Sequence, residues 1–225
     1  MSNPTTTSTG SEWRLPAVEA TGKSAVVRTG PSGLVIGKTN RADISLRLFR
    51  PQGTRIFLAA PEYATWLLIF RAACLGAHIT IVSGNQRNWK ALADSIQRVG
   101  GTVDLLTRAD KVPGQGRPYR PSLVVDDADG FDSTQVAVGA WQAIAVIGDV
   151  STGSAVHSLR NCDLALLGPL DAKGLDNVRR AYVLSQAQLR QATNLGQSDV
   201  VLAMPRRTTR VSMPPGAQEY RLLFN

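Results

Sequence analysis

The chain has 225 residues, of which 43% are hydrophobic, and it carries a formal net charge of +8. This length suits one domain or two, and the apolar content allows a core that needs no disulfide or metal. Cys74 and Cys162 are far apart and form no CxxC motif, which argues against a disulfide framework and favours a reducing compartment. The apolar run at 64–70 is too short to span a membrane. We expect a cytoplasmic protein that partners can hold at the periphery of the inner membrane.

The basic residues are mostly arginine and are scattered along the chain, with one cluster near the C-terminus. This cluster consists of Arg206, Arg207 and Arg210, and we expect it to be an interaction site. A positive surface attracts acidic proteins and anionic lipid head groups. The chain has no nucleic-acid motif and no aromatic residues interleaved with the arginines, so we do not expect nucleic acid as a partner. Arginine-rich codon usage in a GC-rich genome would explain the same charge without any partner.

The N-terminal part of the chain favours a disordered tail followed by β-structure. Residues 1–12 are polar and predict a disordered tail. Residues 13–54 contain short β patterns and predict a β-rich lead-in that packs on the main domain. Within them, β-like runs at 25–29 and 34–37 flank a Gly-Pro-Ser-Gly turn, which predicts a hairpin. The alternation at 44–49 predicts a half-buried strand.

Residues 55–225 show the alternation of strands and helices that is typical of an α/β domain. The first three expected strands are short apolar runs, at 56–60, 78–82 and 103–106. Pro61 suits the first turn of the helix after the first strand, and Asn85 suits the N-cap of the next helix. Strands that alternate with helices in this way pair in parallel, in a sheet with helices on both faces.

The rest of the domain continues this pattern and ends in β-structure. We expect strands at 123–125, 144–147 and 164–167, and a helical region at 171–193 in two pieces, with Ser185 capping the second. Residues 199–203 and 209–213 predict a C-terminal β-hairpin. The predicted fold class is therefore a three-layer α/β domain with a mostly parallel sheet, Rossmann-like or a degenerate P-loop fold, with a β-rich N-terminal lead.

The run from Thr21 to Ser24, TGKS, matches the end of a phosphate-binding loop but lacks the context of one. The first glycine of that motif would fall at Ala17, and β-like residues follow where a helix is needed. The α/β pattern places such a loop at residues 59–63, which contain no glycine and no lysine. Pro61 has no N–H to offer a phosphate, and Glu62 would repel one. We therefore predict no catalytic residue, no cofactor and no metal.

Two polar strand ends keep a second interpretation open. The strand at 123–125 ends in Asp126 and Asp127, and phosphate-loop enzymes hold magnesium with such residues. Asp149 and Ser151 lie in a polar loop after another expected strand, at the end where α/β sheets bind ligands. These four residues are the candidates for a nucleotide site. The simpler interpretation, which we favour for the two strand-end aspartates, is that such residues make turns and helix caps.

The order of these elements and several short strings resemble known families. The strings include "LGAHITIV" and "QRNWKAL", and the resemblance covers roughly residues 33–222. This stretch is similar to the soluble part of type VII secretion components of the EccE kind, found in actinobacteria. Its layout also resembles FtsK/HerA-type translocase ATPases, including the EccC motor.

The resemblance implies a component of a secretion complex whose partners are other secretion-system proteins. Because the phosphate loop of the motors is missing, we expect a structural or assembly component that is not an enzyme. The alternative is a nucleotide-binding or divergent ATPase-like domain that uses the strand end at Asp126 and Asp127.

Overall fold

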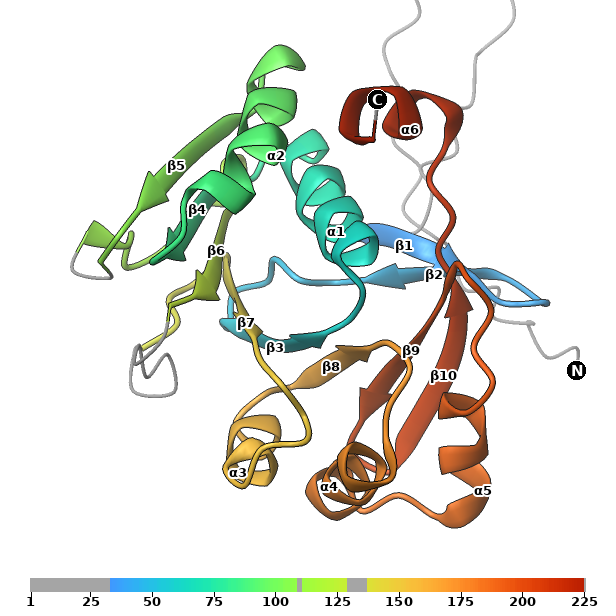
Figure 1. Cartoon of the computed structure of the whole chain (residues 1–225). Helices are drawn as coiled ribbons and strands as arrows, with labels where there is room; N and C mark the ends of the chain where they lie inside the picture. The colour runs from blue at the N-terminus through green and yellow to red at the C-terminus, as the bar shows by residue number, and fades with distance from the viewer. Residues whose placement is uncertain (1–32, 109–110, 129–136, 225) are drawn as a thin grey trace, which may run out of the picture. The chain divides into compact units, whose positions relative to one another are not determined.

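The computed structural model describes residues 33–108, 111–128 and 137–224 (Figure 1). The tail expected at 1–12 and the strand expected at 25–29 lie outside the described residues. Among the described helices, none combines the length and the hydrophobicity that crossing a membrane requires.

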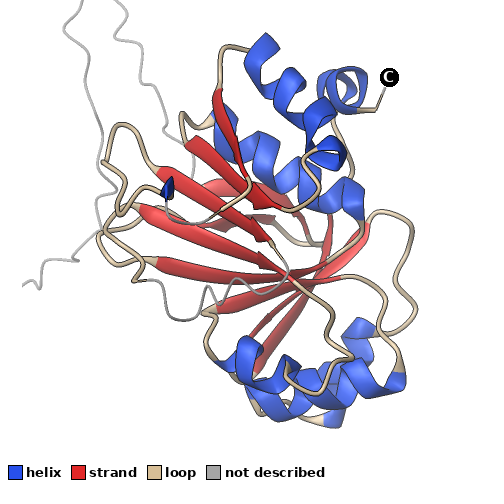
Figure 2. Ribbon diagram, turned by 60° about the vertical axis from the view of Figure 1, so that its left-hand side comes forward, coloured by secondary structure: helices blue, strands red, loops and turns tan. Residues whose placement is uncertain are grey.

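A ten-stranded mixed sheet runs through the described part of the chain (Figures 1 and 2). Its strand order is β2-β1-β10-β9-β8-β3-β7-β6-β4-β5. The six strands from β8 to β5 pair in parallel, and the remaining pairs are antiparallel, so the predicted fold class is confirmed. The strands are β1 (Leu34–Lys38), β2 (Asp43–Leu46), β3 (Thr54–Ala59), β4 (His78–Ser83), β5 (Thr102–Leu106), β6 (Ser122–Asp127), β7 (Gln142–Ile147), β8 (Leu164–Leu167), β9 (Asp199–Met204) and β10 (Arg207–Ser212).

Helices cover both faces of the sheet, which gives three layers (Figure 2). Side chains alternate along β3, so that Ile56 and Leu58 face one layer and Phe57 faces the other. The first layer contains α1 (Glu62–Cys74), α2 (Arg87–Arg98) and α6 (Ala217–Leu223). The second contains α3 (Ala155–Arg160), α4 (Ala172–Tyr182), α5 (Gln186–Leu189) and the 3-10 turn Arg190–Ala192.

Two antiparallel hairpins form the four strands at one edge of the sheet, β2, β1, β10 and β9. β9 and β10 form the C-terminal hairpin that the sequence predicts. β1 pairs with β2 in the other hairpin, and the turn between them is closed by a hydrogen bond of 2.9 Å from Thr39 N to Ala42 O. The residues expected to form one half-buried strand at 44–49 contribute their first part to β2.

The helix caps agree with the sequence at one position and differ at another. Ser185 caps α5, as predicted, in a capping box with Gln188. Asn85 does not cap α2, so that prediction was wrong. Helix α2 begins after Gln86, and the side chain of Asn85 donates to Asn88 Oδ1 at 3.3 Å instead of accepting from the backbone.

Candidate functional site

The carboxyl ends of the parallel strands β8, β3, β7, β6 and β4 lie together, and we call this the carboxyl-terminal side of the sheet. The chain enters this group at β3, between β8 and β7, and later adds β4 on one side and β8 on the other. Ligands of open α/β sheets bind in the crevice where the strand order reverses in this way. A phosphate loop would therefore occupy the turn from β3 into α1, at residues 59–63.

The turn from β3 into α1 is filled by the protein itself. Gly168 N–H, in the loop after β8, donates to Ala59 O at 2.8 Å. A Cβ built on Gly168 would lie 2.7 Å from Cδ of Pro61, so the two loops are in close contact. Glu62 adds an exposed carboxylate to the first turn of α1, where it opposes the binding of an anion. These residues do not fit the phosphates of a nucleotide.

Asp126 and Asp127 end β6, and their carboxylates have contacts within the fold. Asp127 Oδ2 accepts hydrogen bonds from Trp89 Nε1 at 2.7 Å and from Ser83 Oγ at 2.9 Å. Because Trp89 is a buried residue of α2, Asp127 attaches that helix to the carboxyl ends of the strands. Asp126 is buried, and its Oδ1 accepts from Ala128 N at 3.3 Å.

Asp149 and Ser151 lie in the loop after β7, and hydrogen bonds order this loop. Asp149 Oδ1 accepts from Ser151 N at 2.8 Å, and Ser151 Oγ donates to Asp171 Oδ1 at 2.8 Å. Asp171 is the N-cap of α4 and also accepts from Gly174 N at 2.7 Å. Hydrogen bonds from Gly174 and then Ser151 hold the pKa of the Asp171 carboxyl below its usual value. These contacts are those of a turn and a helix cap.

The four candidate residues lie on the carboxyl-terminal side of the sheet, but their side chains form hydrogen bonds with different groups. Within residues 33–108, 111–128 and 137–224, no group of three or more His, Cys, Asp and Glu side chains is arranged to hold a metal ion. A ligand role for Asp126, Asp127, Asp149 and Ser151 stays a prediction.

The three arginines of the expected interaction site do not point in one direction. Arg206 lies in the turn between β9 and β10, with a positive φ of 60°. Arg207 and Arg210 are three residues apart on β10, which places their side chains on opposite faces of the sheet. Arg210 also binds Asp199 Oδ2, at 2.9 Å from Nε, and this contact lowers the pKa of the Asp199 carboxyl. Their role in an interaction stays a prediction.

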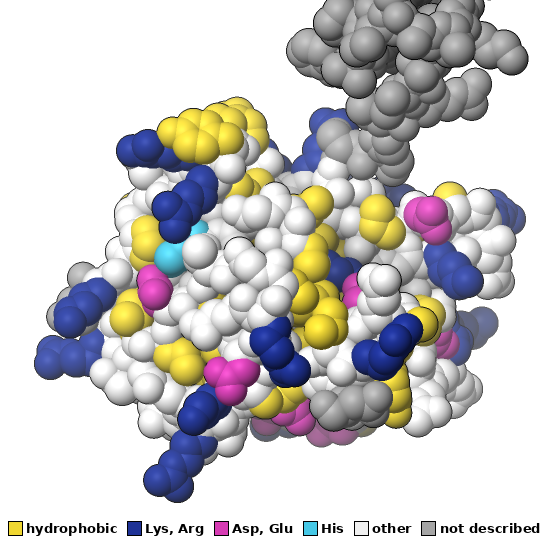
Figure 3. All heavy atoms as spheres, turned by 90° about the horizontal axis from the view of Figure 1, so that it is seen from above, with side chains coloured by type: hydrophobic (Ala, Val, Ile, Leu, Met, Phe, Trp, Pro, Cys, Tyr) yellow, Lys and Arg dark blue, Asp and Glu magenta, His cyan; other side chains and the backbone are white. Residues whose placement is uncertain are grey.

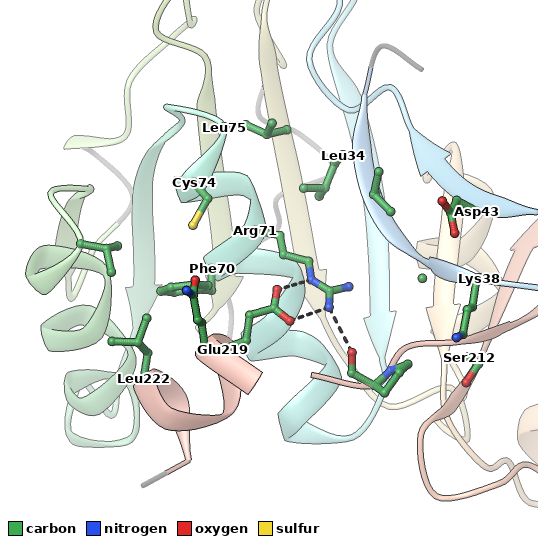
Figure 4. Close-up of a pocket in the computed structure, with 15 residues that line it drawn as sticks. Leu34, Lys38, Asp43, Phe70, Arg71, Cys74, Leu75, Ser212, Glu219 and Leu222 are labelled. Carbon is green, nitrogen blue, oxygen red and sulfur yellow. Dashed lines mark hydrogen bonds and ion pairs between the residues drawn. The ribbon is translucent and has the colours of Figure 1, made fainter. Parts of the chain in front are cut away.

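A groove that the sequence analysis did not identify lies beside β1, α1 and α6 (Figure 4). Its volume is about 650 Å³, and most of its lining side chains are apolar. Arg71 and Glu219 line it and form a bidentate ion pair, at 2.6 and 2.7 Å. Arg71 also donates to the carbonyls of Ile36 and Pro214, at 2.7 and 3.2 Å. Arg71 stands out in the sequence as a charge within an apolar helix, but its partner is 148 residues away.

Comparison with known proteins gives matches among solved structures only: no family model and no curated protein matches the sequence. VirB4 of Thermoanaerobacter pseudethanolicus aligns with a TM-score of 0.57 at 9% identity, over 87% of this chain and 100% of that one. The pCW3 conjugation coupling protein TcpA aligns with a TM-score of 0.51 at 11% identity, over 79% of this chain and 64% of that one. The genome packaging NTPase B204 from Sulfolobus turreted icosahedral virus 2, in complex with AMPPCP, gives 0.51 at 10% identity, over 72% and 98%.

At such identities the likeness concerns the fold. The three proteins are ATPases of the FtsK/HerA type, so that part of the expected resemblance is confirmed at the level of fold. The resemblance to components of the EccE kind has no counterpart among them and stays a prediction. The described chain thus has an α/β fold similar to the folds of these three proteins, with a proline and a glutamate at the strand-to-helix turn where a phosphate loop would lie.

Proposed function

We propose that this chain is a non-catalytic structural component of a protein secretion complex of the type VII kind, acting through protein–protein contacts. The observation that carries the proposal is the contact between Pro61 and the loop at Gly168, next to the carboxylate of Glu62. A phosphate at this turn needs free backbone N–H groups and a nearby cation. The turn offers a residue without an N–H and an anion instead.

The contacts of the acidic residues support the same proposal. A strand-end aspartate that holds Mg²⁺ acts together with the phosphates of the nucleotide, which supply much of the metal's coordination. Asp127 instead accepts two side-chain hydrogen bonds and holds α2 in place. The surface of the molecule is then free to serve as a set of docking faces.

The second candidate is a divergent nucleotide-binding domain. The observation in its favour is that Asp126 and Asp127 end β6 and Asp149 follows β7, on the carboxyl-terminal side of the sheet, where α/β sheets bind ligands. Turnover measurements separate the two candidates, because only a nucleotide-dependent activity would respond to these residues.

The test combines partner recovery with ATP turnover. The tagged full-length chain is crosslinked in its native membranes and purified, and phosphate release is measured with the wild type and with Asp126→Ala. We expect other secretion-system proteins to be recovered with the chain, and the same background turnover for both forms. A magnesium-dependent turnover that Asp126→Ala abolishes would overturn the non-catalytic role. Recovery without any secretion protein would overturn the assignment to a secretion complex.

A further inference from the structure

Exposed apolar side chains gather at the groove beside β1, α1 and α6. In the described part of the chain six large hydrophobic residues are exposed, and three of them line this groove: Val35, Leu75 and Val99, which are 43–50% exposed. Exposed apolar patches of this kind mark interaction sites. Phe70 and Leu222 line the same groove, so it continues into the apolar core (Figure 4).

The groove lies at the amino ends of the parallel strands. Leu75 directly follows α1, and Val99 directly follows α2. Both helices connect parallel strands, so each runs back from the carboxyl ends of the strands to the amino ends. The groove is therefore at the amino ends of the parallel strands, while Pro61 and Asp127 lie at their carboxyl ends. Figure 3 shows this face, with hydrophobic side chains in its middle and Lys and Arg side chains around them, together with several Asp and Glu side chains.

A hydrogen-bonded turn with two arginines precedes β6, and so lies at the same amino ends of the parallel strands. Residues Arg117 and Arg120 exchange two backbone hydrogen bonds of 3.0 Å, so Pro118 and Tyr119 form its tip. Tyr119 is 77% exposed, and its hydroxyl accepts from Arg117 Nη1 at 2.9 Å. We call residues 117–120 the arginine turn. Tyrosine and arginine are the residues that most often dominate binding energy at protein interfaces.

The arginine turn and the groove are linked through the start of β4. Arg120 Nη2 lies 3.4 Å from Nδ1 of His78, which follows Leu75 by three residues. Neither Arg117 nor Arg120 makes an ion pair within residues 33–108, 111–128 and 137–224. The charge of Arg71 in the groove, in contrast, is matched by Glu219. Lys38 and Asp43 add one charge of each sign to the lining of the groove, so the charge of the arginine turn makes the described charge around the groove net positive.

We propose that this face docks an acidic protein segment, an amphipathic helix whose apolar side chains enter the groove and whose carboxylates reach Arg117 and Arg120. An apolar centre with charged residues beside it is the usual composition of a protein interface, and complementary charge sets the choice of partner. A single-stranded nucleic acid fits less well. The groove offers aliphatic Val35, Leu75 and Val99 where bases would stack on aromatic rings.

This proposal rests on the proposed function, because it assumes that the chain acts through protein contacts. Its test, however, concerns the amino ends of the strands and not the turn from β3 into α1. The probes are two fluorescein-labelled amphipathic helical peptides with the same leucine face, one rich in glutamate and one with lysine at those positions. Fluorescence anisotropy with the full chain measures their Kd. We expect the acidic peptide to bind more tightly than the basic one. A turnover result that contradicts the proposed function would leave this comparison unaffected.

Substitutions locate the binding. We expect Leu75→Asp, and separately Val99→Asp, to weaken binding of the acidic peptide by about tenfold or more, as for hot-spot side chains. The double change Arg117→Ala and Arg120→Ala should weaken it by about tenfold and flatten its dependence on salt. Val183→Asp is the matched control, since Val183 is exposed but does not line the groove. It should leave the Kd unchanged.

Three outcomes would overturn the proposal. The first is no saturable binding of the acidic peptide by the wild-type chain. The second is equal affinity for the acidic and basic peptides, which would remove the role of the arginine turn. The third is that a labelled oligothymidylate displaces the peptide and loses affinity on Arg117→Ala but not on Leu75→Asp. That result would identify the face as a nucleic-acid surface.

Discussion

Replacing Arg71 with alanine is expected to lower the free energy of unfolding by up to about 3–5 kcal/mol, the cost of breaking a fully buried ion pair. Arg71 and Glu219 are 17% and 20% exposed, and Arg71 also satisfies the carbonyls of Ile36 and Pro214. Its loss leaves a partly buried carboxylate and two carbonyls without their donor. Urea denaturation followed by circular dichroism measures the change. Glu219→Gln, which keeps an acceptor, should cost less and serves as the second variant if Arg71→Ala does not fold.

The matched control for this change is Arg179→Ala. Arg179 forms an exposed pair with Asp176 one helical turn away, and such pairs contribute less than about 1 kcal/mol. An equal loss of stability in Arg179→Ala and Arg71→Ala would contradict a special role for the pair in the groove.

The effect of Arg71→Ala should also depend on pH. Burial would raise the pKa of the Glu219 carboxyl, but hydrogen bonds from Arg71 and Gly216 outweigh it and hold the pKa below its ordinary 4.5. A carboxyl whose pKa is lowered in the folded state stabilises the protein above its unfolded pKa, and this contribution is lost as the pH falls through the folded value. The difference between wild type and Arg71→Ala should therefore shrink below about pH 4.5. A difference that stays constant well below pH 4.5, through the range where the Glu219 carboxyl is protonated, would contradict the ion pair as its source.

Replacing Asp127 with alanine is expected to destabilise the fold by about 2–4 kcal/mol, because two donors lose their acceptor. Trp89 and Ser83 are both buried, at 6% and 1% exposure, so water does not readily replace the carboxylate. Asp127→Asn, which retains one carbonyl oxygen, should cost less. Thermal and urea unfolding measure both variants.

The control for Asp127→Ala is Asp149→Ala, at an exposed aspartate on the same carboxyl-terminal side of the sheet. Within the described residues its carboxylate accepts one hydrogen bond, from Ser151 N, so Asp149→Ala should cost only about 1 kcal/mol. An Asp127→Ala variant as stable as the wild type would contradict the structural role. Removal of functional carboxylates often leaves stability unchanged or improved, so that result would favour the nucleotide-binding alternative.

The parallel part of the fold could be predicted because its signals are local. The apolar runs that became β3 and β4, and the helix face between them, lie within one short stretch of sequence. Ser185 was predictable for the same reason, since a cap and its partner Gln188 are three residues apart. At the turn from β3 into α1, the prediction that no phosphate binds depends on the identities of Pro61 and Glu62, and it stays a prediction.

The contacts that define the groove could not be predicted, because they join distant parts of the chain. Nothing near Arg71 in the sequence indicates Glu219 as its partner, and the sequence around Trp89 does not point to Asp127. At Asn85, in contrast, a local sequence signal predicted a helix cap that the structure does not have. Asparagine is a good N-cap residue, but Ser83 Oγ accepts the hydrogen bond of Asn85 N, and the helix begins one residue later than predicted.

The central claim is that Pro61, Glu62 and the loop at Gly168 leave no place for phosphate at the start of α1. Calorimetric titration of the full chain with Mg-ATP tests it most directly. The account predicts no heat of binding when Mg-ATP is titrated to a few times about 1 mM. A titration over this range detects a Kd of about 1 mM, which corresponds to a binding free energy of about 4 kcal/mol. A magnesium-dependent Kd of about 1 mM or below that Asp126→Ala abolishes would contradict it.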